Sequence, residues 1–184
     1  SIKHPIWQGE GITSVAKILV AQGKYTDAVN IFRDLVLHAR REIQYADGDL
    51  RKGKLADMET VGAVEQGWAL VAWAEESGQQ SDWDKAKSHF EALPGQYPNN
   101  EVVAAAVLNG VGRSLMAKDP RAALLKFVEA EVKHFTARSE VARALWLKAQ
   151  ALEKMGRQAD LDAAEVALKE LRELYPESEW AKRK

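Results

Sequence analysis

Residues 23–35 of the chain read GKYTDAVNIFRDL, and this stretch decides the fold class. Gly23 and Tyr25 form a turn signal, and the apolar residues that follow have the spacing of one helix face. Ala28 on that face lets a second helix approach closely, and Phe32, one turn later, fills the space beside it. The stretch therefore predicts a tight turn followed by a helix that packs closely against its neighbour.

The same small-then-large pair recurs along the chain, at Ala86/Phe90, Ala123/Phe127 and Ala164/Leu168. The intervals between these later pairs are 37 residues (86 to 123) and 41 residues (123 to 164). A second series of aromatic residues has intervals of 38 and 40 residues and consists of Tyr97, Phe135 and Tyr175. Two independent markers with one period are typical of a helical repeat.

In its order of turn glycine, turn aromatic, small residue and second aromatic, the stretch 23–35 resembles the tetratricopeptide repeat family. This resemblance implies an all-α, right-handed solenoid of about four antiparallel helix pairs that binds other proteins and has no catalytic activity. Tyr175-Pro176-x-Ser178 and the looser Tyr97-Pro98 also resemble the repeats of bacterial cell-envelope proteins. That second resemblance implies a bacterial periplasm or cell envelope as the setting.

The first repeat interval is longer than the others, at 58 residues (28 to 86). We therefore expect an insertion of about 20 residues at 40–60, between the first and second units, which forms a loop or a helix extension. Otherwise the sequence predicts one repeat domain over residues 1–184. Because the chain starts at Ser1 and shows no signal peptide, we expect a processed form or a segment of a longer protein.

Apolar spacing and turn signals predict eight helices. Five of them cover about 11–22, 25–45, 58–77, 102–117 and 158–174, and the other three end near Leu93, Phe135 and Met155. Leu93 is an expected end because Pro94-Gly95 follows it. Expected N-caps are Ser81 or Asp82, Asn99 or Asn100, and Asp119. Residues 1–10 are expected to be irregular, with Ile6 and Trp7 covering the end of the first helix pair.

Composition and motifs argue against several other functions. The charge is balanced, with 26 basic and 27 acidic residues, so no whole-chain field favours nucleic acid. There is no cysteine, and no apolar run is long enough to insert in a membrane. Asp47-Gly-Asp49 lacks the later ligands of a calcium loop, and Gly110-x-Gly112 completes no phosphate-binding motif. Four scattered histidines give no metal spacing, so we expect no cofactor and no enzyme.

The family resemblance places the binding groove on the first helix of each pair. Counting back from the turns gives Thr13, Ser14 and Lys17, then Asn109, then Arg143, Trp146 and Gln150, and Arg113 lies just off these positions, one turn along from Asn109. The candidate partner-binding residues are Lys17, Asn109, Arg113, Arg143, Trp146 and Gln150. Such residues favour the backbone or carboxylate of an extended or helical peptide. Asn109 either faces the groove or is hydrogen-bonded to a neighbouring helix, because an unpaired buried amide is costly. The alternative function is a self-associating or spacer module of a larger protein, which exposed Trp7 or Trp180 would favour.

Overall fold

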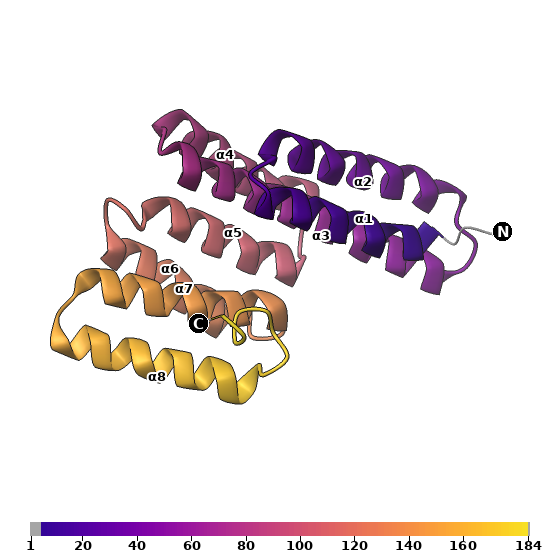
Figure 1. The fold of residues 1–184 in the computed structure, drawn as a ribbon. Coiled ribbons are helices and arrows are strands. Elements are labelled where there is room, and N and C mark those ends of the chain that lie inside the picture. The colour runs from indigo at the N-terminus through magenta and orange to yellow at the C-terminus, as the bar shows by residue number, and fades with distance from the viewer. Residues whose placement is uncertain (1–4, 184) are drawn as a thin grey trace. The chain divides into compact units, whose positions relative to one another are not determined.

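A computed structural model describes residues 5–183 of the chain, with side chains from residue 9 onward. The described residues form eight α-helices (Figure 1): α1 Pro5–Ala21, α2 Tyr25–Tyr45, α3 Asp49–Ser77, α4 Gln80–Gln96, α5 Glu101–Leu115, α6 Pro120–Lys133, α7 Arg138–Met155 and α8 Gln158–Leu174. The chain divides into two compact units, Ser1–His89 and Phe90–Lys184, and the division falls inside α4.

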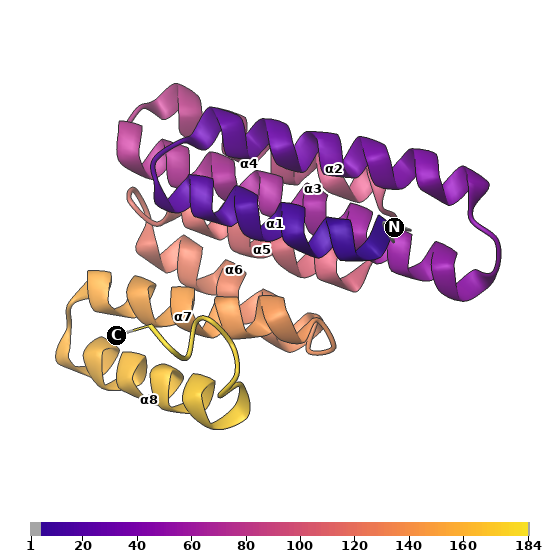
Figure 2. The ribbon, with the colours of Figure 1, turned by 45° about the vertical axis from the view of Figure 1, so that its right-hand side comes forward.

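In the first unit, α2 packs along α3, and α1 packs on both of these helices (Figure 2). The core contains Ala28 and Phe32 of α2, both almost completely buried, together with Ala16 of α1 and Ala69 of α3. The predicted roles of Ala28 as a close-contact residue and of Phe32 as the filling aromatic are thus confirmed.

In the second unit, consecutive helices pack in pairs, α5 with α6, α6 with α7 and α7 with α8, and α5 also contacts α7. Ala123 and Phe127 of α6 are fully buried, and Ala164 of α8 is buried while Leu168 is half-buried. Helices packed in sequence-adjacent pairs confirm the predicted all-α class of an α-solenoid.

Several helix ends lie where the sequence places them. Asn100 caps α5 by accepting a hydrogen bond from the backbone N–H of Val103 at 3.1 Å. Asp119 caps α6 in the same way, accepting from Ala122 N–H at 2.9 Å, with a proline at the first helical position. Gly156 ends α7 with a positive φ of 75°, a conformation that suits glycine.

The prediction that residues 1–10 are irregular is wrong for residues 5–10, which belong to α1. Gly9 is buried where α1 approaches Met58 of α3, and a Cβ at position 9 would overlap the Met58 side chain. Gly9 is therefore a packing residue and does not break the helix. The predicted capping by Ile6 and Trp7 falls on side chains outside the described ones.

Two expectations for α4 are also wrong. The helix does not end at Leu93 but continues to Gln96 with Pro94 inside it. Proline removes a single N–H from the ladder, and the bonding resumes where the Tyr97 N–H donates to the Leu93 carbonyl at 2.9 Å. Neither Ser81 nor Asp82 is the N-cap, since α4 begins at Gln80. Asp82 instead accepts a hydrogen bond from the Ser77 hydroxyl at 2.8 Å.

The extra residues at 40–60 extend a helix. α2 ends at Tyr45, and α3 begins at Asp49 and runs for 29 residues, so only residues 46–48 lie outside helices. Of the two forms that the sequence leaves open, the helix extension is the one observed.

Close helix contacts in the second unit depend on glycine. A Cβ at Gly110 of α5 would overlap the fully buried ring of Phe90, so we expect Gly110→Ala to lower the free energy of unfolding by about 2 kcal/mol. Gly53 of α3 is the matched control because no atom of the described residues lies within 4 Å of its Cβ position. Gly53→Ala should raise stability by up to about 1 kcal/mol, through helix propensity alone. Urea unfolding followed by circular dichroism measures both, and equal effects of the two substitutions would contradict the close contact.

Candidate partner-binding surface

Five of the six candidate binding residues lie on two helices that contact each other in the second unit. Asn109 and Arg113 are on α5, and Arg143, Trp146 and Gln150 are on α7. The sixth, Lys17, is on α1 in the first unit, where its ammonium lies 3.4 Å from the carboxylate of Glu65 on α3. Beside Lys17, Thr13 and Ser14 donate their hydroxyl hydrogen bonds to carbonyls of their own helix.

A buried polar network joins α5 to α7. The Asn109 amide donates to the backbone carbonyl of Glu140 at 2.9 Å and to its Oε2 at 3.0 Å. The other carboxylate oxygen, Oε1, accepts from the guanidinium of Arg143 at 2.8 Å. All three side chains are buried, and those of Arg143 and Glu140 are only 5% and 4% exposed. Asn109 is thus hydrogen-bonded to a neighbouring helix, which decides between the two alternatives for this residue.

The segment 176–183, whose position the sequence analysis did not predict, lies on α7. After α8 the chain turns back, and residues 176–183 lie along α7 (Figure 1). The ring of Trp180 is 4.8 Å from that of Trp146, between centroids. The guanidinium of Arg143 lies 4.9 Å from the Trp180 ring. Trp180 also packs on the apolar cluster that α7 and α8 form with Leu145 and Leu171.

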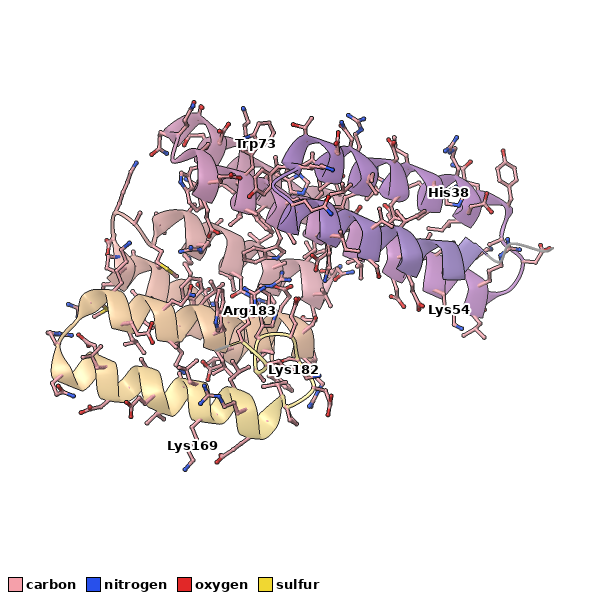
Figure 3. The ribbon with its side chains drawn as sticks, in the orientation of Figure 1. His38, Lys54, Trp73, Lys169, Lys182 and Arg183 are labelled. Atoms are coloured by element: carbon pink, nitrogen blue, oxygen red, sulfur yellow. The ribbon has the colours of Figure 1, made fainter. Side chains whose placement is uncertain are left out.

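Arg183 completes this arrangement (Figure 3), since its guanidinium lies 4.0 Å from the Trp180 ring and 4.8 Å from the Trp146 ring. A guanidinium over an indole face is attracted by the quadrupole of the ring. The α7 face therefore holds a non-helical segment through stacked aromatic and cationic side chains. In the sequence, this contact is indicated only by the presence of Trp180 and Arg183 close together. Because the segment is not helical, no periodicity predicts which side chains face α7.

The remaining candidate residues are half-buried and continue the same helix faces. Arg113 is one turn beyond Asn109 on α5, and Gln150 is one turn beyond Trp146 on α7. Arg113 also has a guanidinium nitrogen 2.8 Å from the sulfur of Met116.

Titratable groups with a displaced pKa have simple causes. Hydrogen bonds from lysine or arginine lower the pKa of Asp82, Glu129 and Asp160, so these carboxylates stay ionised. Burial lowers the pKa of His89, whose Nε2 lies 2.8 Å from the Ala63 carbonyl oxygen. A general acid needs a carboxyl pKa raised toward neutrality, and the shifts of these three carboxylates run the other way.

Within the described part of the chain, no three His, Asp or Glu side chains are grouped so as to hold a metal ion. None of the described helices has the length and apolar composition needed to cross a bilayer.

Comparison with known families gives a match to the tetratricopeptide repeat over residues 69–100 and 143–178. The first segment runs from α3 to the end of the loop after α4, and the second comprises most of α7, all of α8 and the Tyr175-Pro176 junction. No curated protein and no solved structure gave a match to the chain.

The match over these two segments and the paired helices make the chain similar to helical repeat proteins of the tetratricopeptide type. Repeats of this kind are in general non-catalytic modules for protein–protein interaction, which points to a protein partner.

The buried network should be the most sensitive polar feature of the second unit. We expect Glu140→Ala to lower the free energy of unfolding by about 3 kcal/mol, because Arg143 then stays buried without its carboxylate. Glu129→Ala is the control, since it removes a more exposed carboxylate that pairs with Lys126 and Lys133. Its effect should stay below about 1 kcal/mol. Similar losses in urea unfolding for both variants would refute the special role of Glu140.

Proposed function

We propose that this chain is a non-catalytic interaction module that binds a segment of a partner protein on the face formed by α5 and α7. The observation that carries the proposal is the chain's own segment 176–183, which already lies on α7. A surface that accommodates one non-helical segment through side-chain stacking has the chemistry to accommodate another.

The contacts of Trp180 indicate which partner segments suit this face. Trp146 offers an aromatic ring, and Arg143 offers a guanidinium that Glu140 holds in place. An aromatic side chain of the partner followed by a basic one would reproduce the contacts of Trp180 and Arg183. The half-buried Arg113 and Gln150 would then bind the partner's backbone or a carboxylate.

Lys17 would belong to a second contact region, on α1 of the first unit. We further propose a bacterial cell envelope as the setting. Its support is the Tyr-Pro junction motif at 97–98 and 175–176, which lies within both matched segments. The alternative function, a self-associating or spacer module, would require a contact surface other than the face formed by α5 and α7.

A synthetic peptide of residues 175–183 tests the α7 face directly. Trp180→Ala empties the stacking position in the full chain, so this variant should bind the labelled peptide more tightly than the wild type does. Adding Trp146→Ala should weaken peptide binding by at least about tenfold, because the ring that receives the indole is lost. Fluorescence anisotropy measures all three affinities.

Phe135→Ala in the Trp180→Ala background is the matched control, because Phe135 is a 70% exposed aromatic residue outside α7. Peptide binding should not change in this control. Affinity capture with the same variants extends the test to natural partners. A partner that is retained by Trp180→Ala and lost from the double variant supports the proposal. If Trp180→Ala binds no peptide, or binds it equally with and without Trp146, the α7 face is not the recognition surface.

A further inference from the structure

A second surface, formed by α1 and α2 of the first unit, is apolar and open. It is a groove of about 710 Å³ between α1 and α2. Its α1 wall consists of Gly11, Ile12 and Val15, and α2 contributes Ile31 and the buried Leu35. Val15 is 51% exposed, and Ile18, one turn further along α1, is 56% exposed. Apolar side chains at this spacing form a stripe that is suited to contact with another helix.

The polar side chains of the groove are ordered along α2. Asp34 comes first, His38 follows one turn later, and Arg41 comes after a further turn (Figure 3 labels His38). Asp34 and Arg41 are seven residues apart and therefore lie on one face of the helix, about 10 Å apart along its axis. The Nε2 atom of His38, between them in the sequence, is buried and has no hydrogen-bond partner among the described residues.

This order of charges is complementary to itself. If two α2 helices pack antiparallel about a two-fold axis level with the middle of the 34–41 interval, Asp34 of each copy opposes Arg41 of the other. A two-fold interface requires such self-complementarity, because one patch meets its own copy. Asp34 is free to turn toward a partner, since its side chain is 71% exposed and its pairing with Arg33 spans 3.7 Å at the surface.

From this geometry we infer that the α1/α2 face binds a second copy of the chain. The apolar stripe supplies the buried area, and the two Asp34–Arg41 pairs set the antiparallel orientation. Gly11 fits the same interface, because none of the described atoms lies within 4 Å of its Cβ position and a second backbone can approach there. The inference is independent of peptide binding on α7, which involves the other unit.

Charge reversal tests the pairing. Sedimentation velocity over a concentration series should show a wild-type dimer. Asp34→Arg places two arginines opposite each other at both ends of the interface, and Arg41→Asp does the same with two aspartates. Each variant alone should therefore have a dissociation constant at least about tenfold higher than that of the wild type. An equimolar mixture of the two variants should form a heterodimer again, since each reversed charge then meets its complement.

Glu173→Arg is the control, with the same change of charge on a 63% exposed side chain of α8. It should leave the dimer unchanged, and Val15→Asp should abolish the dimer by placing a charge in the apolar stripe. Circular dichroism confirms that each variant keeps its helix content. A wild type that stays monomeric throughout the series would overturn the inference. So would a dimer that tolerates both reversals, or single variants that fail to pair when mixed.

Discussion

The structure depends on close helix–helix contacts in which a large side chain of one helix meets a glycine of the next. In the first unit, Gly62 of α3 receives Leu35 and Val36 of α2. In the second unit, Phe90 packs against Gly110, and Phe127 of α6 packs against Gly112 of α5. A glycine in a helix interior costs stability through backbone entropy, so these positions persist because the neighbouring side chain fills the space. The repeat therefore consists of large side chains that pack against small residues of a neighbouring helix. The recurring Ala-x-x-x-Phe motif is the part of this pattern that can be recognised in the sequence.

The contact between α5 and α7 also buries polar side chains. The fully buried Asn109 side chain lies where α5 meets α7, since its amide donates to Glu140. At that depth an unpaired amide N–H or guanidinium N–H would be costly, and Glu140 accepts hydrogen bonds from both Asn109 and Arg143. Two of the residues that the sequence suggests for binding thus fix the register of α5 on α7. The network also holds the Arg143 guanidinium 4.9 Å from the Trp180 ring.

Most features that depend on residues close together in the sequence were predicted correctly, whereas several features that depend on contacts between distant residues were not. α8 was predicted at both ends because Gly156 and Tyr175-Pro176 act within one or two residues of its termini. Gly110-x-Gly112 completes no phosphate-binding motif, and the contacts with Phe90 and Phe127 show that both glycines are packing residues. Failures occurred where a distant contact decided the outcome. From the sequence alone, Gly9 suggests an irregular segment. The structure shows that Gly9 lies within α1 and packs against Met58 of α3. The position of Trp180 depends on the whole α7–α8 pair, which no local pattern encodes.

The two candidate surfaces have one physical origin. A helix pair of a repeat protein buries apolar side chains against its neighbours, and it can also present an apolar face that no neighbouring helix covers. On α7 and α8 the chain covers that face itself, because Trp180 and Ala181 pack on Leu145 and Leu171. On α1 and α2 the corresponding surface carries Val15 and Ile18 at more than half exposure. An apolar stripe with charges ordered along its edge is selective for a partner with the opposite order. A second copy turned by 180° is the simplest molecule that presents one.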